Sequence, residues 1–238
     1  MDAAGYTTLT RQKGLKAELA TVAHNIANMS TTGFRREGVI FSEYVSVTGG
    51  NADSVSMARA EVGMTDLRQG PLTKTGGRFD MAIEGDGFFQ VETPDGPRLT
   101  RAGAFTPNAA GDLVTPDGHL VMDAGGAAIF IPPDATNLSI AADGTISAAG
   151  RPLGQIGLFQ PTDPIDLSRQ EGTLFDAPGG FEPVADSVIL QGFLEGSNVD
   201  PVSEITRMIE VQRAYELGQS LLEREDERLR DAIRTMGK

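Results

Sequence analysis

Few residues of this chain carry the chemistry of an active site, and their spacing matches no common catalytic motif. Cysteine is absent and only two histidines occur, His24 and His119, so thiolate sites and multi-histidine metal sites are excluded. Residues 85–87 read Gly-Asp-Gly, like the start of a dinucleotide-binding loop, but the third glycine and a following helical pattern are missing. A turn between two strands is the favoured interpretation there, and we expect no catalytic residue, no cofactor and no metal ion.

Carboxylates are the remaining candidates for chemistry, because the chain has 33 acidic and 20 basic residues and a net charge of −13. A carboxylate pair of a glycoside hydrolase stays open as an alternative, although a solvated acidic surface explains these residues more simply. Binding to nucleic acid or to an anionic membrane requires clustered lysines and arginines. The acidic balance therefore predicts no nucleic-acid partner.

The N-terminal residues have neither a basic start nor an unbroken apolar run, so we expect no cleaved signal peptide. No stretch of the sequence approaches the roughly 18 apolar residues that a membrane-spanning helix requires. Direct membrane insertion is therefore not expected.

Proline and charge divide the chain into a turn-rich middle and two different ends. All 13 prolines lie between Pro71 and Pro201, and most of the net negative charge falls on residues 49–195. We expect four parts, namely an N-terminal helix at 1–36, an extended linker at 37–70, a central β domain at 71–194 and a C-terminal helix at 195–238. The predicted fold class is α+β, with the two long terminal helices forming a coiled-coil-like arm.

The N-terminal helix is predicted from a seam of apolar residues whose spacing alternates between four and three positions. These residues are Leu15, Leu19, Val22, Ile26 and Met29. The polar run at 28–34 is expected to end the helix, since Gly33 suits the left-handed conformation found beyond helix ends. Phe34 is expected to fold back on the last helical turn.

The C-terminal helix has a well-marked start, because Asp200 is a preferred N-cap residue and Pro201 fits the first helical position. A second apolar seam follows at Met208, Val211, Tyr215, Leu222, Leu229 and Met236, with Ile205, Ile209, Leu221 and Ile233 on its flank. At about 1.5 Å per residue, a helix over 201–236 is roughly 54 Å long. Such a helix extends beyond a small domain.

The middle of the chain reads as all-β. Apolar and polar residues alternate over 79–84 and again over 89–93, which is typical of half-buried strands. Pro-Asp-Gly turns follow at 94–96 and 116–118. Further strands are predicted at 128–131, 138–141, 144–147, 155–159 and 187–193. Short strands at this spacing predict a barrel-like or sandwich-like domain.

Two interpretations of the terminal seams are open. In one, both helices pack on the central β domain as ordinary core helices do. Against this, the alternating strands of the middle are able to form a core of their own, and both seams have a period near 3.5 residues. This combination favours helices that pair with each other and with neighbouring copies of the chain.

Motifs at both ends and in the centre resemble the flagellar rod and hook family. The run Ala-His-Asn-Ile-Ala-Asn-Met-Ser-Thr-Thr-Gly-Phe at 23–34 resembles its N-terminal signature, apart from a histidine where the family commonly has asparagine. Residues 196–202 and 208–216 resemble its C-terminal signature, and residues 80–89 and 99–105 are similar to its larger members. The matches occur in the family's order, so the resemblance is specific.

Within this family, the opening residues Met1-Asp2 and Tyr6-Thr7 and the compact length most resemble the proximal-rod member, with the distal-rod member second. The resemblance implies a structural subunit of the bacterial flagellar basal-body rod and no enzymatic activity. It also implies terminal helices that assemble into a helical tube that transmits torque, with the β domain outside.

The implied partners are other copies of the chain, neighbouring rod proteins of the same family and the flagellar type III export apparatus. The implied location is the periplasmic part of the basal body, reached without signal cleavage, and a chain without cysteine suits that oxidising compartment. Two alternatives stay open. One is a soluble β-domain protein with a binding or hydrolytic function, dimerised by its terminal helices, and the other is a hook subunit.

The predicted assembly interface combines seam residues with signature residues of both ends. Its members are Leu15, Leu19, Val22, Asn25, Ile26, Asn28, Met29, Thr32, Gly33, Phe34, Asn198, Pro201, Met208, Val211, Gln212, Arg213, Tyr215, Leu222 and Leu229. A helical stack of subunits supplies partners for such seams through head-to-tail contacts that do not close into a ring.

Overall fold

The computed structural model describes residues 3–46, 55–184 and 187–236, and the chain divides into two compact units. The helical unit comprises Met1–Ala27, Glu37–Met64 and Asp200–Lys238, and the β unit comprises Asn28–Arg36 and Thr65–Val199. A helix at each end of the chain and a β-rich middle confirm the predicted α+β class.

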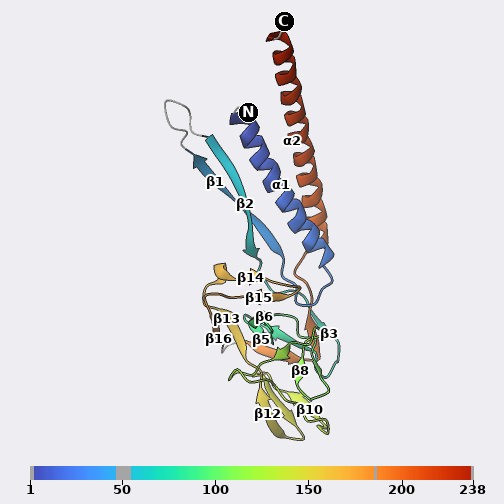
Figure 1. The fold of residues 1–238 in the computed structure, drawn as a ribbon. Coiled ribbons are helices and arrows are strands. Elements are labelled where there is room, and N and C mark those ends of the chain that lie inside the picture. The colour runs from blue at the N-terminus through green and yellow to red at the C-terminus, as the bar shows by residue number, and fades with distance from the viewer. Residues whose placement is uncertain (1–2, 47–54, 185–186, 237–238) are drawn as a thin grey trace. The chain divides into compact units, whose positions relative to one another are not determined.

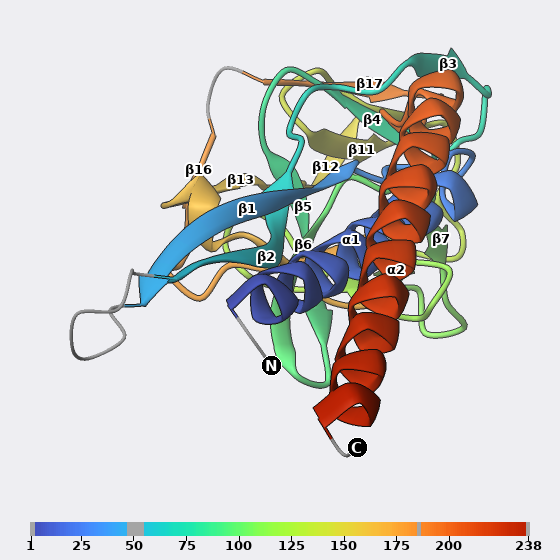
Figure 2. The same ribbon diagram turned by 90° about the horizontal axis from the view of Figure 1, so that it is seen from above.

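The helical unit contains both long helices, α1 (Ala3–Ala27) and α2 (Pro201–Met236), which lie side by side (Figures 1 and 2). Strands β1 (Glu37–Ser46) and β2 (Val55–Thr65) pair with each other, and β1 contacts α1. These strands occupy most of the segment 37–70, for which the sequence predicted an extended linker. Strand formation there has a local reason, because residues 39–45 are rich in β-branched and aromatic side chains.

The start of α2 agrees with the prediction. The backbone N–H of Val202 donates to Asp200 Oδ1 at 3.2 Å, and the Ser203 hydroxyl donates to Asp200 Oδ2 at 2.6 Å. Pro201 is the first helical residue, where no backbone N–H is needed. Asp200 therefore caps α2 with its side chain.

The stabilisation by Asp200 is expected to depend on pH. The hydrogen bonds from the Ser203 hydroxyl and the Val202 N–H lower the pKa of Asp200 below its usual value. A lowered pKa means that this stabilisation is present above the unfolded-state pKa, about 3.9, and is lost as the pH falls through the folded-state value. We expect Asp200→Asn, which keeps a capping oxygen, to lower the thermal midpoint of the helical signal more at pH 7 than at pH 3. An equal reduction at both pH values would contradict this assignment.

Helix α1 ends directly before the polar run that was expected to end it. It stops at Ala27, so Met29 lies beyond the helix and is exposed. The chain turns instead, because the Thr31 hydroxyl donates to Asn28 Oδ1 and the Thr31 N–H donates to the Asn28 carbonyl at 3.1 Å each. Gly33 has the expected left-handed conformation, with φ at 71°.

The β unit is built from short strands. They are β3 (Leu72–Lys74), β4 (Met81–Glu84), β5 (Phe88–Thr93), β6 (Gly96–Thr100), β7 (Thr106–Pro107), β8 (Leu113–Val114), β9 (Leu120–Val121), β10 (Leu138–Ile140), β11 (Thr145–Ala148), β12 (Arg151–Gln155), β13 (Leu158–Pro161), β14 (Ser168–Arg169), β15 (Leu174–Asp176), β16 (Phe181–Pro183), β17 (Val188–Gln191) and β18 (Phe193–Glu195). A short 3-10 helix, η1 (Pro164–Asp166), follows β13.

The largest sheet has nine strands, with the order β14-β15-β6-β5-β9-β8-β7 and with β13 and β16 attached beside β5. Strands β10, β11 and β12 form a second sheet, and β17 pairs with β4 and β18 with β3. No sheet closes on itself in the described part of the chain, so the barrel-like form is not confirmed. Both predicted Pro-Asp-Gly turns are present, whereas residues 128–131 form only isolated bridges instead of a strand.

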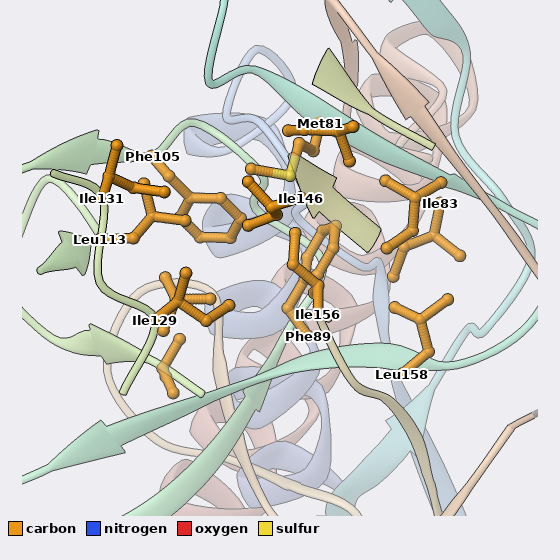
Figure 3. Close-up of a cluster of buried hydrophobic side chains, with 14 residues drawn as sticks. Met81, Ile83, Phe89, Phe105, Leu113, Ile129, Ile131, Ile146, Ile156 and Leu158 are labelled. Atoms are coloured by element: carbon orange, nitrogen blue, oxygen red, sulfur yellow. The ribbon is translucent and has the colours of Figure 1, made fainter. Parts of the chain in front are cut away.

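Two clusters of buried side chains form the core of the β unit. Successive residues of β5 point to opposite faces of the sheet, so Phe89 belongs to the larger cluster and Phe88 to the smaller one. The larger cluster also contains Met81, Ile83, Ile146 and further aliphatic side chains (Figure 3). The β unit therefore has a hydrophobic core of its own.

Candidate functional site

The predicted seams meet where α1 packs against α2. Val22 of α1 and Val211 of α2 are buried, with Val211 only 2% exposed, and Leu15 is buried as well. Of the other seam residues within the helices, Leu19, Ile26, Met208, Tyr215 and Leu222 are partly buried, whereas Met236 is 87% exposed. The side chain of Leu229 lies outside the described residues. Part of the predicted interface is therefore used within one chain.

Polar contacts fix the antiparallel register of the two helices. Gln12 Nε2 donates to the Tyr215 carbonyl at 2.8 Å, and Arg207 Nε donates to Glu18 Oε1 at 2.6 Å. Glu18 follows Gln12 along α1, whereas its partner Arg207 precedes Tyr215 along α2, so the two helices run antiparallel. Because these groups are partly buried, the contacts define one alignment of the seams.

Asn25 joins three elements of the helical unit. Its side chain is fully buried; Oδ1 accepts the Glu37 N–H at 3.0 Å, and Nδ2 donates to the Glu37 carbonyl at 2.9 Å. Nδ2 also lies 3.2 Å from Glu204 Oε2 on α2. Asn25, a member of the predicted interface, therefore holds the start of β1 to both helices of its own chain.

We expect Asn25→Ala to lower the free energy of unfolding by about 1–3 kcal/mol, because partly buried backbone groups of Glu37 and the buried Glu204 carboxylate each lose a hydrogen bond. Urea unfolding followed by the helical circular-dichroism signal measures this loss. Lys13→Ala, an exposed change on the same helix, is the control. A loss no larger than that of the control would show that Asn25 has no clamping role.

In the β unit, Asn198 ties together segments that are far apart in the sequence. Its Oδ1 accepts the Arg36 N–H at 2.6 Å, and its Nδ2 donates to the carbonyls of Asp66 and Arg68 at 2.9 and 2.8 Å. The chain passes between the two units next to residues 36, 65 and 199. Asn198 therefore holds together three of the segments through which the chain enters and leaves the β unit.

Gly33 and Phe34 complete this junction. The Gly33 N–H donates to the Glu195 carbonyl at 2.7 Å, and a Cβ at Gly33 would overlap the backbone of Ala102. Phe34 is fully buried, with the Arg169 guanidinium 4.2 Å from its ring centroid. Its ring thus contacts Arg169 of the β unit.

Glu195, which lies close to Asn198 in the sequence, is the centre of a buried charge cluster. None of the charged residues in this cluster was among the predicted site residues. Glu195 Oε1 accepts hydrogen bonds from Arg35 Nη1 at 2.6 Å and from the Gly70 N–H at 2.8 Å, and Glu195 Oε2 lies 3.2 Å from Arg101 Nη1. Burial lowers the pKa of Arg101 to about 10, and the Glu195 carboxylate opposes that shift. Arg35 lies next to one of the signature motifs and Arg101 lies within another. Because arginine is rarely fully buried, the sequence offered no reason to place either side chain in the interior.

Three exposed apolar residues in the first turns of α2 form a separate surface, which we call the outer stripe: Val202, Ile205 and Ile209. They follow one another at spacings of three and four, so they lie on one side of α2. Ile205 is 50% exposed and Ile209 is 44% exposed. Of the predicted interface residues, Met29, Pro201, Gln212 and Arg213 are also exposed, whereas Asn28, Thr32 and Asn198 are partly buried.

The described residues offer little for metal or membrane binding. They contain no group of three or more histidine, aspartate or glutamate side chains placed to hold a metal ion. Neither helix of this part of the chain combines the length and apolar character of a bilayer-spanning segment. Two cavities of the β unit, of about 310 and 190 Å³, have one carboxylate each in their lining, Asp86 and Asp143.

Three family models match the chain. Residues 6–35 match the flagella basal body rod protein model, and residues 82–148 match the flagellar hook protein FlgE/F/G D1 domain. Residues 190–235 match the flagellar basal body rod FlgEFG protein C-terminal model. The matched segments cover most of α1, about half of the β-rich middle and nearly all of α2.

Whole relatives align over almost their full length. The chain is 41% identical to the flagellar basal-body rod protein FlgF of Caulobacter vibrioides, over 100% of this chain and 99% of that protein. It is 40% identical to FlgF of Mesorhizobium japonicum, over 98% and 97%, and 32% identical to the rod protein FlgG of Bacillus subtilis, over 96% and 97%. The higher identity to these FlgF proteins agrees with the resemblance to the proximal-rod member. The chain thus belongs to the flagellar basal-body rod protein family, a family of structural components and not of enzymes.

Proposed function

We propose that this structural rod subunit assembles through its terminal helices, with the outer stripe covered by other copies of the chain and by neighbouring rod proteins. The observation that supports this proposal is the exposed apolar stripe on a helix whose opposite side already packs on α1. Apolar side chains gain free energy when a partner removes them from water. Repeated coiled-coil-like contacts of this kind give a helical tube that transmits torque.

In this proposal the helical unit, with both terminal helices, contributes to the rod core, and the β unit, which includes most of residues 71–194, forms an outer domain. The outer domain keeps the predicted barrel-like or sandwich-like character as part of the proposal. We also propose that the chain is exported by the flagellar type III apparatus and occupies the periplasmic part of the basal body. The family of its relatives supports this location, because they are basal-body rod proteins.

Purified basal bodies test the proposal. A tagged chain expressed in a strain that lacks the native gene is expected to restore motility and to co-purify with basal bodies. Electron microscopy of the deletion strain is expected to show no completed rod. Normal motility in the deletion strain, or a functional tagged chain that never co-purifies, would contradict a role as rod subunit.

The alternative of a hydrolytic β domain has less support. Glycoside hydrolysis uses two carboxylates on opposite sides of the scissile bond. The two cavities of the β unit named above have a single carboxylate each. The described surface thus favours assembly over hydrolysis.

A further inference from the structure

A groove lies between α1 and α2 within the helical unit. It has a volume of about 260 Å³, and its walls include Gln12 and Leu15 of α1 and Leu217, Gly218 and Leu221 of α2. Its lining is mainly apolar, yet Leu217 is 70% exposed. The groove is therefore an apolar surface that the chain itself leaves open to solvent.

A polar atom in this groove lacks a partner. Gln12 Nε2 donates to the Tyr215 carbonyl at 2.8 Å, but Gln12 Oε1 is buried and accepts no hydrogen bond from the described residues. Gly218 makes room for Gln12, because a Cβ there would overlap the Gln12 amide. A buried acceptor without a donor is unfavourable, so an occupant that brings a donor gains affinity.

The C-terminal end of α2 extends past the end of its partner helix α1. With Gln12 opposite Tyr215, α2 continues for 21 residues to Met236, whereas α1 continues for only nine to Ala3. At 1.5 Å per residue, α2 extends about 18 Å past the start of α1. In Figure 1 the C-terminal end of α2 indeed continues beyond the N-terminal end of α1.

The apolar line that α1 covers continues onto this free end. Val211, Leu222 and Ile233 follow one another at intervals of 11 residues, close to three helical turns, so they share one side of α2. Val211 is buried against α1, but Ile233 is 70% exposed and Met236 is 87% exposed. We call the surface formed by Ile233 and Met236 the tail patch.

We propose that the groove of one copy binds the C-terminal end of α2, including the tail patch, of a second copy. This inference rests on the proposed function, which it makes specific. The groove and the tail patch occupy different positions along α2, so a contact between them joins two copies head to tail. A row of such copies has a free groove at one end and a free tail patch at the other. A groove-to-groove contact would instead close a dimer and leave both tail patches exposed.

Disulfide cross-linking tests this contact, because the native chain has no cysteine. Full-length Leu217→Cys and Ile233→Cys chains are mixed under conditions in which the chain assembles, oxidised mildly and separated on a non-reducing gel. The two cysteines can bond only when their Cβ atoms are about 3.5–4.5 Å apart. We expect a cross-linked pair from the mixture at several times the yield of either variant alone.

Thr235→Cys, on the other side of the tail, and Glu216→Cys, outside the groove, are the matched controls, and both positions are exposed. Thr235→Cys mixed with Leu217→Cys, and Glu216→Cys mixed with Ile233→Cys, are each expected to give only background cross-linking. If electron microscopy shows assembled chains but the 217–233 pair cross-links no more than the controls, the groove contact is wrong and the proposed function stands. If chains neither assemble alone nor enter basal bodies, both the proposed function and this inference fail.

Discussion

Replacing Glu195 by alanine is expected to lower the free energy of unfolding of the β unit by about 3–5 kcal/mol, because it leaves buried positive charge without compensation. Arg35 and Glu195 are fully buried, and Arg101 is nearly so. Arg35 Nε and Nη2 and Arg101 Nε already lack a hydrogen-bond acceptor among the described residues. The Glu195 carboxylate is thus the main counter-charge of both guanidinium groups.

Chemical unfolding of the β unit, followed by a probe placed in its core, measures this effect. Glu182→Ala is the control, since Glu182 is an exposed acid on β16 of the same unit. It is expected to change stability by less than about 0.5 kcal/mol. A Glu195→Ala chain as stable as this control would show that the cluster is not a structural centre.

The second large effect is expected on the outer stripe. We expect the double change Ile205→Asp and Ile209→Asp to abolish incorporation into basal bodies and thus motility. Two carboxylates at these positions cannot be buried against a neighbour without losing their hydration. Because both side chains are about half exposed in the single chain, its own fold is expected to be retained.

Export and folding must be separated from assembly in that experiment. Circular dichroism and thermal unfolding of the purified variant are expected to match the unchanged chain within about 1 kcal/mol. Ile205→Leu with Ile209→Leu keeps the stripe apolar and is expected to retain motility. A folded Asp variant that builds normal rods would show that the outer stripe is not an interface.

Local features of the sequence predicted the fold well. The cap at Asp200, the start of α2 at Pro201 and the left-handed Gly33 depend on neighbouring residues, and each is present. The alternation along β4 and β5 likewise depends on contacts within one strand and its neighbours. The end of α1 was less predictable, because Met29 continued the apolar spacing beyond the point where the Asn28 turn begins.

The roles of the signature residues were not predictable in the same way. Asn25 and Glu204 lie 179 positions apart and Arg35 and Glu195 lie 160 positions apart, so no local pattern reports either contact. Polar residues in a signature also suggest an intermolecular contact when their burial is unknown. The structure shows Asn25 holding one unit of its own chain together and Asn198 holding the other.

The accessibility of the outer stripe in the free and the assembled protein tests the central claim most directly. A chain with Ile205→Cys carries a single thiol, so a maleimide reagent reports that one position. We predict rapid labelling of the free chain and strong protection in intact basal bodies, with labelling restored after the basal bodies are denatured. Equal labelling of position 205 in free chains and in intact basal bodies would contradict assembly through this face of α2.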